Sequence, residues 1–348
     1  MAEQCNYFPL LVGNESIKAR FACDIAEGHL SHAYIIEGPR GTGKHTFSKQ
    51  VAAAIECKSH AELSSGQIKP CGHCPSCEKI LADKSPDVKV IGLEDDRTTI
   101  GVDAIRDLKN DMYTAPNDLS IKVYIIEDAD LMTEQAQNAF LLSLEEPPEY
   151  ILFFLLCESS TKLLETVRSR APTLRTQRLD GSLIDFLVPT LDTRACAMKE
   201  ENIEEWETLV FVANGSVGYA LELLDPSARK KIFENRRDAK KLISLLSGND
   251  KKSAMEALMS FGKTRADVSK KISFLQYAIR DLMLLKKHEG ASLCFFENSE
   301  AALELSTRFT SEKLLSLYDA TVKARDDLDA NANVKLTLLY MMQSAGLL

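Results

Sequence analysis

The sequence lacks long hydrophobic runs, a secretory leader and an excess of positive charge. No window approaches the roughly 18 uninterrupted apolar residues of a membrane-spanning helix. The opening MAEQCNYFPL does not place positive charge ahead of an apolar stretch, as a signal peptide does. Acidic residues number 51 against 42 lysines and arginines, so the formal net charge is −9. These absences predict a cytoplasmic protein with no membrane partner, and they disfavour one that grips nucleic acid through its overall field.

The chain also has no internal repeat and no long low-complexity linker. With 348 residues, 45% of them apolar and 27% charged, it has the composition of a globular protein of two or three domains. Apolar runs of strand length alternate with helical patterns in the first half, whereas no convincing strand follows Leu179. We therefore predict an α/β domain at 1–178 with helices on both faces of a parallel sheet, a small helical domain at 179–223 and an all-α domain at 224–348.

The α/β prediction depends on short, nearly continuous apolar runs. Such runs are typical of strands that are buried on both faces of a parallel sheet, and the apolar spacing between them is typical of helices. The expected strands are 32–38, 88–92, 122–127, 150–157 and 172–179, and the expected helices are 46–57, 102–110, 133–144 and 163–169.

A glycine-rich loop, GPRGTGK, joins the first expected strand to the helix after it. In such a loop, glycines allow backbone N–H groups to turn toward phosphate oxygens, the helix N-terminus adds partial positive charge, and a lysine pairs with the β and γ phosphates. The spacing therefore predicts a site for ATP or ADP. Its expected residues are Gly38, Gly41, Gly43 and Lys44.

The position after the lysine departs from this pattern. A serine or threonine hydroxyl normally holds magnesium there, but the residue is His45, and imidazole is a poor ligand for a cation that prefers oxygen. Thr46 comes one residue late, a displacement of about 100° around a helix. We expect both residues to border the phosphates, and magnesium-dependent hydrolysis is not supported.

Carboxylates follow the expected strand 122–127, where hydrolysis of this kind needs them. The usual order is an aspartate for magnesium and then a glutamate for water, but here Glu127 precedes Asp128. Exchanging the two side chains moves each carboxylate by roughly 1.5 Å, enough to disturb catalysis. Alternatively these residues, Asp130 above all, only place negative charge before the next helix.

A cysteine-rich insert at 57–77 predicts a metal site. Overlapping C-x-x-C steps allow three thiolates to converge on one ion, and a fourth upstream cysteine can close a tetrahedral set with no open position, which indicates structural zinc. His60 and His73 are possible substitute ligands, and an iron–sulfur cluster or unliganded thiols are the alternatives. The expected ligands are Cys57, Cys71, Cys74 and Cys77.

Together these segments resemble bacterial clamp-loader subunits of the AAA+ class. VGNESIKARF, SHAYIIEGPRGTGKHT, the cysteine insert, KVYIIEDADLMTEQAQNAFLLSLEEPPE and TVRSRA occur in the family's order, and the likeness runs from Leu11 to about Leu224 and more loosely beyond. The resemblance implies an AAA+ P-loop domain, a helical lid at 179–223 and, at 224–348, a collar through which a ring assembles. It also implies that Val12 and Gly13 border the adenine.

Two groups within this family fit the chain. The gamma/tau subunits are ATPase motors, whereas delta-prime subunits share the architecture with degraded ATPase motifs. His45, the order Glu127-Asp128, and a glycine at 218, where the family has a nucleotide-sensing arginine, favour delta-prime. The sequence after 150–157 also lacks the family's sensor threonine. The alternatives are an active gamma/tau-type ATPase and another AAA+ remodelling or regulatory protein.

Arg170, in the motif TVRSRA, resembles the family's arginine finger. Such an arginine enters the ATP site of a neighbouring subunit, and its alternative is an ordinary surface arginine. The resemblance therefore implies a stator that works with gamma/tau motor subunits and a delta subunit. Through the assembled complex it would act on the sliding clamp and primer–template DNA during replication.

Overall fold

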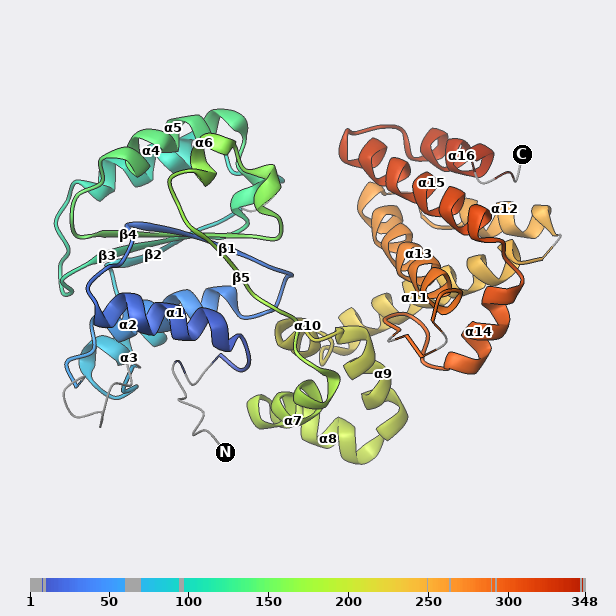
Figure 1. The fold of residues 1–348 in the computed structure, drawn as a ribbon, viewed down its shortest axis with the longest axis horizontal. Coiled ribbons are helices and arrows are strands. Elements are labelled where there is room, and N and C mark those ends of the chain that lie inside the picture. Colours follow the sequence, from blue (N-terminus) through green and yellow to red (C-terminus); the bar gives the residue numbers. More distant parts are fainter. Residues whose placement is uncertain are drawn as a thin grey trace. The chain divides into compact units, whose positions relative to one another are not determined.

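The computed structural model describes residues 8, 11–59, 70–93, 97–248, 250–262, 264–288, 290–291, 293–344 and 346. They form two compact units (Figure 1). The first contains the chain up to Leu179 together with Ser216–Gly218, and the second contains the rest. The finer division into three domains stays a prediction.

The first unit is built around a parallel sheet. Its strand order is β2-β3-β4-β1-β5, and every neighbouring pair is parallel, as the alternation of strands and helices predicts. The carboxyl ends of β1 and β4 meet in register, with Glu37 beside Cys157. The strands are β1 (Ala33–Glu37), β2 (Val88–Ile91), β3 (Lys122–Ile126), β4 (Ile151–Cys157) and β5 (Thr173–Arg175).

Burial divides these strands into a centre and two edges. Strands β3 and β4 are buried throughout, and β1 is buried except at its last residue. Strands β2 and β5 are partly exposed. The expectation that every strand is buried on both faces was therefore wrong for these two, because each has a neighbour on one side only. Strand β5 is also shorter than the predicted 172–179.

Helices cover both faces of the sheet (Figure 1). Side chains alternate along β1, so that Tyr34 and Ile36 join one core with Phe47, while Ile35 joins the other with Phe140. One face carries α1 (Glu15–Ala26), α2 (Lys44–Ile55) and α3 (Pro75–Leu81), and the other carries α4 (Val102–Met112), α5 (Glu134–Glu145) and α6 (Glu165–Arg168).

A buried lysine fastens the sheet to α4. The Lys122 side chain is only 2% exposed, and its Nζ lies 3.0 Å from Asp111 Oδ2. The same carboxylate accepts a 2.6 Å hydrogen bond from Tyr124 and lies 2.8 Å from Lys89 Nζ. Desolvation opposes ionisation, but the bonds from Lys89, Tyr124 and Lys122 outweigh it and lower the pKa of Asp111 to about 2.

Among the described residues, the second unit contains helices joined by turns and loops and no strand, as predicted. Its largest core joins α11, α13 and α15 through residues such as Leu242, Ile279 and Leu317. In the described part of the chain, no helix combines the length and apolarity that crossing a membrane requires. The helices are α7 (Gly181–Leu191), α8 (Thr193–Glu201), α9 (Ile203–Ala213), α11 (Pro226–Leu246), α12 (Lys251–Met259), α13 (Arg265–Leu285), α14 (Ser299–Thr307), α15 (Ser311–Asp329) and α16 (Val334–Ser344), while α10 (Val217–Glu222) begins in the first unit.

Candidate functional site

The glycine loop lies between β1 and α2, where the sequence predicts it. Gly38 N–H donates to Cys157 O at 3.0 Å, which fastens the loop to the end of β4. A Cβ on Gly38 would lie 1.9 Å from Thr176 Oγ1, so only glycine fits. Thr176 Oγ1 also lies 2.8 Å from Thr42 Oγ1. Thr176 is thus a part of the loop's support that the motif does not reveal.

Lys44 is directed at the carbonyl groups of its own loop. Its ammonium donates to Gly38 O at 2.6 Å and to Pro39 O at 3.0 Å. Burial lowers the pKa of this ammonium, although nearby carboxylates such as Glu158 oppose the shift. A phosphate bound in the loop would therefore exchange contacts that the lysine already makes within the protein.

His45 and Glu127 contact each other beside this lysine. Imidazole Nδ1 lies 3.1 Å from Glu127 Oε1, with the two side chains 38% and 39% exposed. Imidazole Nε2 is buried and has no hydrogen-bond partner among the described residues. Thr46 is exposed. The histidine that replaces the magnesium-binding hydroxyl is therefore paired with the first carboxylate of the strand end.

The other two carboxylates differ in their surroundings. Asp128 is exposed and has a left-handed backbone, with φ 47°, before η2 (Ala129–Leu131). Asp130 accepts the Glu158 N–H at 3.4 Å, which links the ends of β3 and β4. Thr133 caps α5 by accepting the Ala136 N–H at 3.2 Å. Asp130 therefore links the ends of β3 and β4, while the side-chain cap of α5 is Thr133.

The segment from Leu11 to Asn14 lies against the loop. A Cβ on Gly43 would lie 2.6 Å from Leu11 Cδ1, and one on Gly13 would lie 2.5 Å from Leu179 Cδ2. Asn14 Oδ1 accepts the Gln177 N–H at 2.6 Å. Val12 is half-buried within this segment. Leu11 is thus beside the glycine loop and Gly13 beside Leu179, and the adenine-side role of Val12 and Gly13 stays a prediction.

Ser216 and Gly218 close over the loop from a distant part of the sequence. Gly218 N–H donates to Gly41 O at 3.0 Å, and Ser216 Oγ donates to Arg40 O at 2.9 Å. A Cβ on Gly218 would lie 2.8 Å from Gly41 Cα. An arginine at this position would therefore have to displace the loop backbone.

Arg170 is held at the surface of the first unit. Its guanidinium donates to Glu145 Oε1 at 2.5 Å, at the end of α5, and to Thr166 O at 2.9 Å in α6. The side chain is 34% exposed. Within the described chain its bonds go to α5 and to residues of and next to α6, and none goes to the glycine loop.

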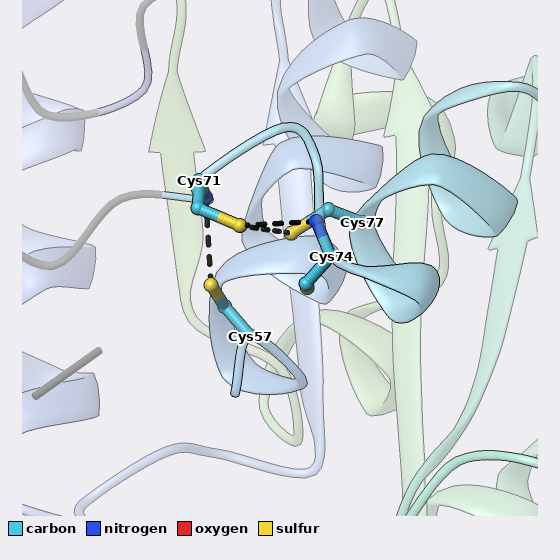
Figure 2. A group of neighbouring side chains, drawn as sticks. All are labelled: Cys57, Cys71, Cys74 and Cys77. Carbon is cyan, nitrogen blue, oxygen red and sulfur yellow. Dashed lines mark hydrogen bonds between the residues drawn. The ribbon is translucent and has the colours of Figure 1, made fainter. Parts of the chain in front are cut away.

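The four predicted cysteines converge on one point (Figure 2). Their sulfurs all lie within 4.8 Å of one another, and Cys71 Sγ lies 3.9 Å from Cys77 Sγ. Four sulfurs at the usual Zn–S length of about 2.3 Å stand about 3.8 Å apart in a tetrahedron, so the set fits zinc. His73 instead contacts Cys71 O at 2.9 Å, and His60 lies outside the described residues.

Local structure explains how the cysteines meet. Cys57 follows α2, Cys74 precedes Pro75 at the start of α3, and Cys77 lies within α3. Backbone N–H groups of Cys71 and Cys74 donate to the sulfurs of Cys57 and Cys71 at 3.4 and 3.3 Å. Such donors stabilise thiolates, the form that binds metal.

The thiols differ in acidity. Desolvation opposes ionisation of Cys71, but the backbone N–H groups of His73 and Cys74 lower its pKa to about 6. Burial raises the pKa of the Cys77 thiol well above its ordinary value and also raises that of the Cys57 thiol. A divalent cation would offset these differences by its charge, since it stabilises all of its thiolate ligands.

The fold and these sites define an α/β protein with a P-loop-like glycine loop between β1 and α2. Residues 13–180 match the protein family described as "DNA polymerase III, delta subunit". The chain is 28% identical to DNA polymerase III subunit tau of Bacillus subtilis (strain 168), over 92% of this chain and 58% of that one. It is 31% identical to the gamma/tau subunit of Mycoplasma genitalium, over 73% of this chain and 41% of that one. It is 25% identical to DNA polymerase III subunit gamma of Buchnera aphidicola subsp. Schizaphis graminum, over 97% of this chain and 94% of that one.

This chain is thus similar to DNA polymerase III subunits of the gamma, tau and delta types. It spans less than two thirds of the length of the tau and gamma/tau relatives named above. The resemblance read from the sequence agrees with these similarities to DNA polymerase III subunits.

Proposed function

We propose that this protein is a delta-prime-type stator, a clamp-loader subunit that does not hydrolyse ATP efficiently itself and serves hydrolysis in a neighbour. The observation that carries the proposal is the 3.1 Å contact between His45 and Glu127. Hydrolysis of this kind needs oxygen ligands for magnesium, namely a hydroxyl after the loop lysine and the first carboxylate of the strand end. Here an imidazole takes the place of the hydroxyl and engages Glu127, which holds the position of that first carboxylate.

Nucleotide binding on the isolated chain tests this directly. We expect that any ATP or ADP held by Lys44 binds with little dependence on magnesium, because the cation has no hydroxyl ligand beside the loop. His45→Ser, which supplies that hydroxyl and frees Glu127, should make the affinity depend on magnesium. The affinity of each chain for a fluorescent ADP analogue, measured once with Mg²⁺ and once with EDTA, distinguishes magnesium-dependent from magnesium-independent binding. Strong magnesium dependence in the unaltered chain would count against the proposal.

Arg170 is proposed as the group that acts in trans. A guanidinium at a phosphoryl-transfer site stabilises the charge of the transition state, and its loss lowers the rate by about 10³ or more in related enzymes. Arg170→Ala should leave assembly with the motor and delta subunits intact and lower the ATPase rate of the reconstituted complex. Arg168→Ala is the matched control, because Arg168 is an exposed arginine of α6. Equal rates for both variants would exclude the finger.

Glu145 permits a sharper test, because it competes for the same guanidinium. The Arg170–Glu145 pair is 34% and 44% exposed, and pairs at such exposure contribute about 0.2–1 kcal/mol. Glu145→Gln should therefore raise the rate of the complex by up to about fivefold. The same change in an Arg170→Ala background should have no effect. An equal effect in both backgrounds would show that Glu145 acts independently of Arg170.

The proposal also covers the metal site and the partners of this subunit. The four cysteines hold structural zinc, since four thiolates leave no position open for substrate. The motor subunits, the delta subunit, the sliding clamp and primer–template DNA are partners within the cytoplasmic replication complex. An acidic chain fits a subunit that meets DNA mainly through the assembly.

An active gamma/tau-type ATPase is the second candidate. Lys44 and the loop glycines favour it, and two of the relatives carry the name gamma/tau or tau. That function requires the purified chain to hydrolyse ATP alone and to lose the activity in Lys44→Ala. Absence of turnover above background would exclude this second candidate.

A further inference from the structure

A basic groove lies between α11 and α14 in the second unit, away from every residue assigned above. It is a cavity of about 430 Å³, within the range of about 300–1,000 Å³ that is typical of small-ligand sites. Four cations line it, namely Arg237, Lys240 and Lys241 from α11 and Arg308 after α14, against one carboxylate, Glu304. This local excess is opposite in sign to the chain's net charge of −9.

Two of these four cations are not neutralised within the described part of the protein, whereas Arg308 pairs with Glu304 at 2.7 Å. Among the described residues, Arg237 and Lys241 take part in no ion pair. Lys240 reaches only 3.9 Å from Glu297, whose carboxylate is already bound by Arg236. Cations left in this state are available to carboxylates of another molecule.

The lining of the groove also has an apolar part that is held in place. Phe296 and Leu305 contribute to it, and Phe296 is only 5% exposed. The buried carboxylate of Asp281 accepts N–H bonds from Phe295 at 2.7 Å and Phe296 at 3.3 Å. Arg236 donates to Phe295 O and packs against the Phe295 ring. Since this loop is fixed from beneath, a ligand would meet a preformed surface.

We propose that the α11–α14 groove binds an acidic segment of a partner protein that carries one apolar side chain. The apolar residue would lie against Phe296 and Leu305, and its flanking carboxylates would pair with Arg237 and Lys241. Nucleic acid fits less well, because binding of single strands relies on exposed aromatic rings that stack with bases, whereas Phe296 is buried.

Fluorescence anisotropy on the full chain tests this proposal. The probe is a labelled nine-residue peptide of aspartates with one central phenylalanine, and it should bind saturably and weaken with added salt. Arg237→Glu/Lys241→Glu should lower its affinity about tenfold or more, because two contacts become repulsive. Lys286→Glu/Lys287→Glu, an equal charge change at exposed positions outside the groove, should stay within twofold.

The apolar half has its own variants and probes. Leu305→Glu should lower the affinity as well, whereas Leu315→Glu, at an exposed position on α15, should not. Circular dichroism checks that each variant is folded. If the double charge reversal does not fold, Leu305→Glu tests the groove in its place. A peptide without phenylalanine that binds equally well would overturn the proposal. So would absence of saturable peptide binding, or tighter binding of a labelled oligo-dT that the same charge reversal abolishes.

Discussion

Gly218→Ala tests whether the glycine loop is packed as the structure describes. The added Cβ would lie 2.8 Å from Gly41 Cα and 3.4 Å from Gly41 O, and both neighbours are backbone atoms that cannot rotate away. Overpacking of this kind destabilises by about 1–3 kcal/mol. If the loop moves aside, the 3.0 Å bond from Gly218 N–H to Gly41 O is lost too, at about 0.5–1.5 kcal/mol.

A gain in helix propensity opposes this loss. Gly218 is near the start of α10 (Val217–Glu222), where alanine is preferred over glycine by at most about 1 kcal/mol. The net expectation is a destabilisation of the first unit by about 1–3 kcal/mol. That corresponds to a fall in Tm of a few degrees for a unit of this size.

Two measurements check this expectation. Thermal unfolding gives the loss of stability, and hydrogen exchange by mass spectrometry localises it, since amides of the loop and of the first turn of α2 should exchange faster. Gly92→Ala is the control, because its Cβ would meet only the Glu127 side chain at 3.7 Å. If Gly218→Ala matches the control in both measurements, Gly218 does not lie against the loop. Gly218→Arg, which restores the family's arginine, should destabilise further and confer no ATPase activity.

Two further predictions concern pH and metal. Asp111→Asn should destabilise by about 2 kcal/mol at neutral pH, because the folded protein lowers this carboxyl's pKa from 3.8 to about 2. A lowered pKa stabilises above the ordinary value and is lost as pH falls, so the difference from the unaltered chain should shrink between about pH 4 and 2. Urea unfolding measures this difference in the free energy of unfolding. The control is Asp103→Asn, at an exposed position, which should leave the stability unchanged. Elemental analysis of chain purified without chelators should give about one zinc per protein, reduced in Cys74→Ser and unchanged in Cys196→Ser; a ratio near zero in the unaltered chain would reject the site.

The sheet was predictable from sequence because burial of its centre leaves a local mark. Strands β3 and β4 are apolar at almost every position, and such runs are needed where both faces are covered. The edges have weaker marks, so the exposure of β2 and the short length of β5 were missed. Helix α3 was not predicted either, because it is short, belongs to the cysteine-rich insert and shows no clear helical spacing of apolar residues.

The candidate site was predictable where chemistry depends on spacing and not where it depends on distant contacts. Cysteine spacing predicted the sulfur cluster, because three of its ligands fall within one short segment. The contact of Gly218 with Gly41 joins residues far apart in sequence, and nothing near either residue indicates it. The partner of Arg170 was equally hidden, because Glu145 becomes its neighbour only when α5 and α6 pack together.

Packing contacts within the protein can explain why the glycine loop is retained in a chain that does not hydrolyse ATP. Gly38 is required by Thr176, whose Oγ1 a Cβ would meet at 1.9 Å, and Gly43 is favoured by its left-handed backbone, with φ 85°. The loop carbonyls are engaged by the protein's own donors, including Lys44. A loop whose glycines and lysine all have partners within the protein can be retained for packing alone. The motif GPRGTGK by itself therefore does not distinguish a motor from a stator, and the distinction depends on His45, which the packing of the loop does not require.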